Sequence, residues 1–138
     1  MNEIEITDAE WAVMRVIWTL GTATSKEIAS ILMTQKGWQV TTVKTFLGRL
    51  VKKGALQVEK KQHAFVYEST ITEQDSMDKA LNNLFGQLCT MKVGNSLANV
   101  LPDLSLSQAD IKKLQAILTQ KAQTAPNTLA CDCIECAK

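Results

Sequence analysis

Three of the four cysteines of this 138-residue chain lie within its last eight residues. They are Cys131, Cys133 and Cys136, and the polar segment that carries them is too short to build a core around them. Thiolate sulfurs are soft ligands, and soft ligands select metals such as Cu(I) and Zn(II). The types and the spacing of these residues therefore predict a soft-metal site in the tail.

Two metals suit such a site in different ways. Cu(I) accepts two or three thiolates, so the tail cysteines can satisfy it within one chain or in a cluster shared by two chains. Zn(II) prefers four tetrahedral ligands, and the fourth would have to be Asp132, Glu135, a water molecule or a group from a partner chain. We therefore expect a preference for Cu(I) over Zn(II).

Two other interpretations of the cysteines stay open. Neighbouring thiols can oxidise to a disulfide, which is the chemistry of a redox sensor. The tail thiols can also have no specific role. Cys89 is a different case, because it lies beside the apolar stripe that ends at Leu88, and we expect it to be a small core residue.

The sequence shows no signal for secretion or for a membrane. Residues Met1 to Glu5 lack the apolar core of a signal peptide. No run of about 18 apolar residues is present, so no membrane span is expected. These observations predict a cytoplasmic protein, and in that compartment thiols stay reduced and free to bind metal.

Positive charge is concentrated between Thr41 and Lys61, although the whole chain has a net charge of only +1. That segment holds six basic residues against one acid, Glu59. A helix is predicted from Thr41 to Lys53, ending at Gly54, which suits a left-handed cap. Its apolar face has helical spacing and consists of Val43, Phe46, Leu47, Leu50 and Val51.

The opposite face of this helix has side chains that suit a DNA duplex. Short hydroxyls and a lysine at its start can approach base edges, while cations further along and in the following hairpin can contact phosphates. We predict base contacts from Thr41, Thr42, Lys44 and Thr45. We predict backbone contacts from Arg49, Lys52, Lys60 and Lys61.

Two helices should precede this predicted recognition helix. Thr7 and Glu10 form a capping-box pattern before an apolar run that ends at Gly21. A second helix can begin at Thr24 or Ser25, whose hydroxyls suit a helix start.

A hairpin should follow the recognition helix. Strands are predicted over Ala55–Glu59, with Leu56 and Val58 facing inward, and over Phe65–Ser69, with the polar residues 60–63 between them. The predicted fold class is mainly α. It consists of a winged helix-turn-helix domain, with three helices and a two-stranded β-wing, followed by a helical dimerisation region.

The helices expected beyond Thr72 are short and carry apolar stripes. One stripe steps from Met77 to Leu88, a shorter helix is expected over Val93–Leu101, and Ser107 can cap a last one. Helices of this length bury little apolar surface alone, so a second copy of the chain is the simplest partner and a homodimer is expected. The predicted divisions are a winged-helix domain at 1–70, a dimerisation region at 71–123 and a cysteine-containing tail at 124–138.

Several segments resemble the BlaI/MecI/CopY family of repressors. Glu10–Trp18 resembles the first-helix signature of that family, Thr41–Gly54 resembles its recognition helix, and Phe65–Tyr67 fits its second wing strand. The cysteine tail resembles the CopY branch, the copper-responsive repressors of Gram-positive bacteria. That branch usually carries two Cys-x-Cys pairs, whereas this tail has one pair followed by Cys136 alone.

The resemblance implies a homodimer that represses copper-export genes by binding a short inverted repeat of double-stranded DNA. In that branch Zn(II) supports the DNA-bound form, and Cu(I) displaces it and releases the protein. A copper chaperone is then an expected metal donor. Two alternatives remain within the same wider family, namely a thiol-redox-sensing repressor and a β-lactam-responsive repressor released by proteolysis in the downstream helices.

An enzyme is not expected from this sequence. The chain has one histidine, His63, and no nucleophile motif, glycine-rich phosphate loop or paired-carboxylate pattern. A metal buffer without a regulatory role is disfavoured by the basic recognition helix.

Overall fold

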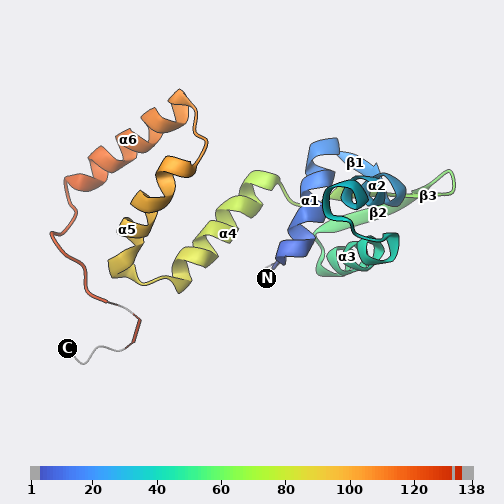
Figure 1. Ribbon diagram of the computed structural model, residues 1–138, viewed down its shortest axis with the longest axis horizontal. Helices are drawn as coiled ribbons and strands as arrows, with labels where there is room; N and C mark the ends of the chain where they lie inside the picture. Colours follow the sequence, from blue (N-terminus) through green and yellow to red (C-terminus); the bar gives the residue numbers. More distant parts are fainter. Residues whose placement is uncertain (1–3, 132, 135–138) are drawn as a thin grey trace. The chain divides into compact units, whose positions relative to one another are not determined.

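The computed structural model describes residues 4–131 and 133–134. The chain divides into two compact units, Met1–Ala80 and Leu81–Lys138. The boundary falls within the helix of residues 73–87. The first unit contains the sheet, three helices and the start of that helix, and the second contains the rest of the helices and the tail (Figure 1). The division into three parts at residues 70 and 123 stays a prediction.

The first three helices are α1 (Asp8–Leu20), α2 (Ser25–Lys36) and α3 (Val40–Lys53). Thr7 and Glu10 close a complete capping box at the start of α1, as predicted, and Thr24 does the same with Glu27 at α2. Helix α3 ends at Gly54, whose φ of 89° lies in the left-handed region that glycine adopts without steric cost.

These three helices bury one apolar core. Fully buried side chains from all three meet there; they are Val13, Met14, Ile17, Ile28, Leu32, Val43, Leu47 and Leu50. Phe46 and Val51 lie partly buried at the edge of this core, which confirms the apolar face predicted for α3. Trp38 packs on Phe46 with ring centroids 5.2 Å apart. This packing fixes the opposite face of α3 in solvent.

A three-stranded antiparallel sheet completes the first unit. Its strands are β1 (Thr22–Thr24), β2 (Leu56–Lys61) and β3 (Ala64–Ser69), in the order β1-β3-β2. The β2–β3 hairpin confirms the predicted wing, so the winged-helix fold class is confirmed. Strand β1 was not predicted, because three residues are too few to show an alternating pattern and tertiary pairing with β3 decides their conformation.

The connection in the wing is shorter than predicted. Lys60 and Lys61 belong to β2, and the turn consists of Gln62 and His63 alone. Both turn residues have positive φ, 46° and 71°, which matches the twist that a two-residue hairpin turn requires.

The prediction that Val58 faces the core is wrong. Its side chain is 40% exposed, whereas Leu56 on the same strand is buried. Strand β2 runs outward beyond the helical core, so only its first residue lies against the core.

One ion pair joins α1 to α3. The Glu10 side chain is 1% exposed and accepts a bond from the Lys53 ammonium at 2.5 Å. Burial acts to raise the pKa of Glu10, but bonds donated by Lys53 and by the Thr7 amide outweigh it, so this pKa lies below its ordinary value. Lys53 is therefore engaged inside the fold, although the sequence places it in the basic segment.

The remaining helices are α4 (Glu73–Gln87), α5 (Thr90–Val100), the short 3-10 helix η1 (Leu101–Asp103) and α6 (Gln108–Ala122). Ser107 and Asp110 form a capping box at α6, which confirms the predicted start of that helix. Among the described residues of α5 and α6, none is buried. None of the helices in the described part of the chain has the length and apolar character that crossing a membrane requires.

Replacing Lys53 by Met should lower the free energy of unfolding by about 2 kcal/mol, a value between those of exposed and fully buried ion pairs. The loss should be present above the ordinary pKa of a glutamic acid and should shrink as the pH falls through the lowered pKa of Glu10, where the wild-type pair is itself broken. Urea unfolding at fixed protein concentration, followed by tryptophan fluorescence, measures this.

The matched control is Lys52→Met, which removes an exposed cation from the same helix turn and should change stability by less than about 0.5 kcal/mol. Equal losses in the two variants at neutral pH would contradict a special role for the Glu10–Lys53 pair.

Candidate nucleic-acid interface and candidate metal centre

The outer face of α3 carries exposed hydroxyls and cations. Thr41, Lys44 and Thr45 are exposed near its start, with Thr42 partly buried, and the exposed Arg49 and Lys52 follow. Within the part of the chain that the structure describes, the cations of this face form no ion pair with a carboxylate. This face therefore presents uncompensated positive charge to solvent.

The start of α3 differs from the starts of α1, α2 and α6. Those three helices close complete capping boxes, whereas Gln39 at the start of α3 makes no side-chain cap hydrogen bond and no acid lies in the first turn. The first-turn amides of α3 therefore have no bond to a capping side chain of Gln39, and a helix N-terminus of this kind favours a phosphate group.

Two further features shape the predicted contact residues. The guanidinium of Arg49 lies 5.8 Å from the centroid of the Phe46 ring, and Phe46 is itself partly buried at the edge of the core. This cation–π contact stabilises the position of the Arg49 side chain. The Thr45 hydroxyl donates a hydrogen bond to the carbonyl of Thr41 at 3.0 Å, which leaves its oxygen free to accept.

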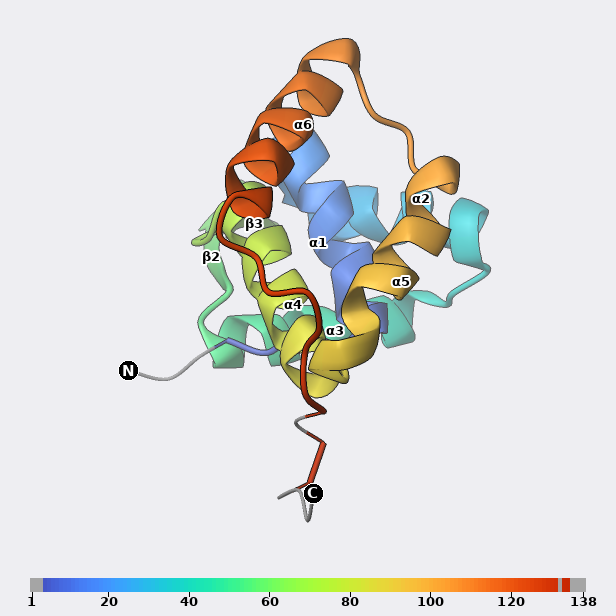
Figure 2. The same cartoon turned by 90° about the vertical axis from the view of Figure 1, so that its left-hand side faces the viewer.

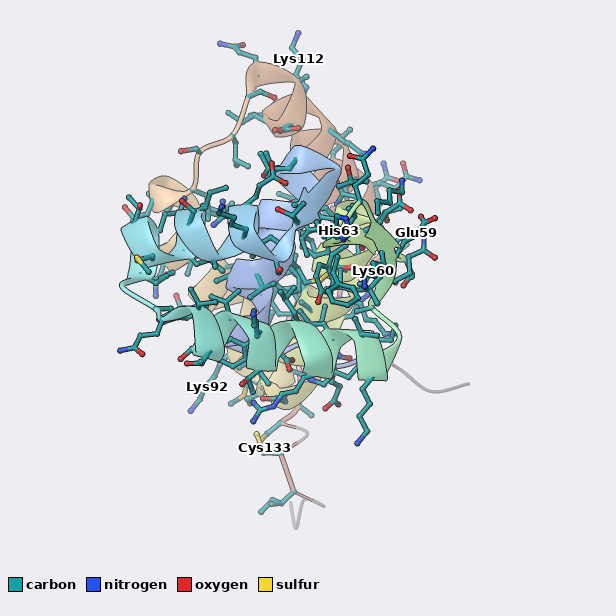
Figure 3. The ribbon with its side chains drawn as sticks, turned by 90° about the vertical axis from the view of Figure 1, so that its right-hand side faces the viewer. Glu59, Lys60, His63, Lys92, Lys112 and Cys133 are labelled. Carbon is teal, nitrogen blue, oxygen red and sulfur yellow. The ribbon has the colours of Figure 1, made fainter. Side chains whose placement is uncertain are left out.

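The wing carries the other predicted cations. Lys60 lies 6.0 Å from the centroid of the Phe65 ring, and the Lys61 ammonium is 3.7 Å from the Glu59 carboxylate. Glu59, Lys60 and His63 lie together on the hairpin (Figure 3). Lys61 is therefore partly neutralised, which makes Lys60 the stronger candidate for a phosphate contact.

Lys26 is a further cation of this surface that the sequence did not predict. Lys26 and Ser25 at the start of α2 line a hollow of about 390 Å³, together with Val40 and Lys44 of α3. The sequence offers no signal for Lys26, because a lysine on an amphipathic helix is usually only solvated. Its position beside Lys44 adds it to the candidate interface.

Three cysteine sulfurs meet in the second unit. Cys89, between α4 and α5, lies 3.8 Å from Cys131 (sulfur to sulfur), and the ligand atoms of Cys89, Cys131 and Cys133 all lie within 4.8 Å of one another. The amide of Cys133 also donates to the Cys131 sulfur at 3.5 Å. Cys133 is exposed and the other two are partly buried, so solvent reaches the cluster.

Because the sulfurs lie close together, hydrogen bonds between them shift the pKa values of Cys89 and Cys133 in opposite directions. A hydrogen bond from the Cys133 thiol lowers the pKa of Cys89, and the amide of Met91 acts in the same direction. Hydrogen bonding to Cys89 and to Cys131 raises the pKa of Cys133 to about 12.

The spacing of the sulfurs fits a soft metal ion. Metal–sulfur bonds of about 2.3 Å place sulfurs bound to one ion about 4 Å apart, and the observed separations lie close to this value. Among the described residues the group consists of three sulfurs with no carboxylate or imidazole, and such a group suits Cu(I) better than a hard cation. These residues are therefore placed to hold a metal ion.

The membership of this cluster corrects one prediction. Cys89 is not a core residue, since it is only partly buried and its sulfur lies against tail sulfurs. Its proximity to a segment 42 positions away has no signature in the local sequence. Cys131 and Cys133 do lie together, whereas Cys136, Asp132 and Glu135 lie outside the described residues.

Three helices, a hairpin wing and an exposed basic third helix define the class of winged helix-turn-helix DNA-binding proteins. The model of the penicillinase repressor family matches residues 6–120. The chain therefore belongs to the penicillinase repressor family, the BlaI/MecI/CopY group of transcriptional repressors, whose members are not enzymes.

Similar proteins agree with this membership. The chain is 47% identical over 133 residues to an uncharacterized 16.5 kDa protein of Latilactobacillus sakei, covering 96% of this chain and 91% of that protein. It is 32% identical over 117 residues to the methicillin resistance regulatory protein MecI of Staphylococcus aureus, covering 85% and 95%. The solution structure of the DNA binding domain of the repressor BlaI matches with a TM-score of 0.50 and 41% identity, covering 54% of this chain and 93% of that domain.

Proposed function

We propose that this protein is a copper-responsive transcriptional repressor. It binds an inverted-repeat operator of copper-homeostasis genes as a dimer and is released when Cu(I) binds its cysteines. The observation that carries the proposal is the meeting of three cysteine sulfurs within 4.8 Å in a chain of a repressor family.

The surface of α3 supports recognition of a DNA duplex. Its uncapped start can approach a phosphate, its hydroxyls and Lys44 can reach base edges, and Arg49 and Lys52 can hold the backbone further along. Lys60 extends the same function to the wing. This interface makes Thr41, Thr42, Lys44 and Thr45 the base-reading group.

The second unit supports a homodimer. Leu81, Leu84, Ile117 and Leu118 are 50%, 48%, 48% and 59% exposed, although helices usually bury such residues. Apolar surface spread over α4, α5 and α6 needs a partner, and a second copy offers the same surface in return. Two winged units held together in this way match the symmetry of an inverted repeat.

The three sulfurs supply the chemistry for sensing copper. Cys89, Cys131 and Cys133 would hold one Cu(I) ion as three thiolates, and Zn(II) would need a fourth ligand. Cys136 stays a proposed metal ligand. A copper chaperone as the metal donor stays a prediction.

One alternative has a specific observation in its favour. Two sulfurs 3.8 Å apart need little movement to form a disulfide between Cys89 and Cys131, so a thiol-redox-sensing repressor remains the second candidate. A β-lactam-responsive repressor gains no support from a cysteine cluster.

Lys44→Ala should weaken operator binding by about tenfold, because a lost base contact costs about 1–3 kcal/mol, without changing the mass of the dimer. If Lys44 also neutralises a phosphate, the slope of log affinity against log salt should become shallower by about 0.9. Fluorescence anisotropy with an operator selected from random DNA measures both. Lys112→Ala on α6 is the charge-matched control, and an equal loss in that variant would remove Lys44 from the interface.

Ile117→Asp should turn the dimer into a monomer, since a carboxylate would lie in the apolar contact between the copies. Analytical ultracentrifugation measures the mass. Lys112→Asp adds the same carboxylate on the opposite face of α6 and should leave the dimer intact. A dimeric Ile117→Asp protein would place the contact elsewhere.

Addition of Cu(I) to the operator complex should release the DNA, and a Cys131→Ser/Cys133→Ser double variant should stay bound, because it has lost two of the three ligand sulfurs. Gel shifts with Cu(I), Zn(II), peroxide and buffer compare the candidates. Release by peroxide that a reductant reverses, without release by Cu(I), would favour the redox sensor and contradict the copper proposal.

A further inference from the structure

The cysteine cluster joins two segments that are far apart in the sequence. Cys89 lies at the corner between α4 and α5, and Cys131 follows 42 positions later. The chain between them forms α5, η1 and α6. After α6 the chain runs back past the α4–α5 corner (Figure 2). An ion bound by both segments therefore closes a loop around these three helices.

The two sides of the cluster are held differently. Cys89 is the N-cap residue of α5, and its carbonyl accepts hydrogen bonds from the amides of Lys92 and Val93 at 2.9 and 3.1 Å. No helix or strand runs through residues 124–131. Cys89 is therefore fixed by regular backbone, whereas Cys131 is placed by an irregular segment.

We propose that Cys89 is the anchoring metal ligand of this protein. It binds one Cu(I) ion together with Cys131 and Cys133, and filling the site fastens the tail to the first turn of α5. This inference rests on the proposed copper-sensing function and adds the residue that connects the tail to the helices.

The electrostatics of the corner favour such a site. Three thiolates around one Cu(I) ion carry a net charge of −2, and the positive end of the α5 dipole lies next to Cys89. Lys92 in the first turn of α5 adds a cation near the cluster. Thiolates are stabilised at helix N-termini and beside lysines, so the corner suits an anionic metal–sulfur group.

The location of Cys89 gives metal binding a route to the dimer. Leu88 and Met91 flank it and are 37% and 51% exposed, as expected for residues of the proposed dimer surface. A tail drawn onto Cys89 covers or displaces this surface. Copper then acts on the dimer contact and lowers operator affinity without touching α3.

The test compares Cys89→Ser with Ser96→Ala, a change at an exposed position further along α5, in the full-length reduced protein. The probe is Cu(I) alone, titrated against a competing chelator. Loss of even an outer-shell partner costs about 10- to 100-fold in metal affinity, so Cys89→Ser should weaken Cu(I) binding by at least about tenfold. Ser96→Ala, which removes no thiol, should bind Cu(I) as the wild type does.

Hydrogen exchange gives a second readout. Cu(I) should protect amides in the first turn of α5 in the wild type and in Ser96→Ala, and should leave them unprotected in Cys89→Ser. Metal-free operator affinity verifies that Cys89→Ser is folded. Wild-type Cu(I) affinity and α5 protection in Cys89→Ser would overturn the anchor while leaving copper sensing intact. Failure of the wild type to bind Cu(I) would instead contradict the proposed function and the anchor together.

Discussion

The packing of α1, α2 and α3 around one apolar core is the constraint on which the rest of the winged unit depends. The buried residues of α3 pack in one core with Met14 and Ile17 of α1, so the opposite side of α3 is exposed to solvent. The hydroxyls and cations of that side therefore extend from a helix backbone whose position the core fixes. The Glu10–Lys53 pair adds a polar link between α1 and α3, and this link uses a lysine that would otherwise belong to the basic surface.

The second unit follows a different principle, since its helices leave their apolar side chains half exposed in a single chain. A second copy of the chain is proposed to cover these side chains, so an event at this surface would act on the proposed dimer contact. The cysteine cluster lies in this unit, at the start of α5. In the proposed account, metal capture and dimer contact involve the same helices, which would give the repressor a direct means of responding to a metal ion.

Features with a local cause could be predicted from the sequence. The capping pairs at Thr7 and Ser107, the Gly54 cap and the apolar face of α3 each depend on residues within about two helical turns, and the structure confirms them. The winged fold could be predicted because its helices and its hairpin each show a local pattern of this kind. Cys131 and Cys133 could be placed together because they lie only two positions apart.

Features decided by tertiary contact could not be predicted. Strand β1 exists because β3 lies beside it, Val58 is exposed because the wing leaves the core, and Lys53 is engaged because Glu10 is buried opposite it. Cys89 is the most consequential case. It follows the apolar stripe that ends at Leu88, which indicates a core residue, whereas its neighbours in space are sulfurs.

The most direct measurement follows Cu(I) occupancy and operator binding in the same titration, with thiolate-to-copper absorption reporting the first and anisotropy of labelled operator reporting the second. The account predicts that operator is released in step with filling of one three-sulfur site per chain. Full occupancy of that site with the operator still bound would contradict it.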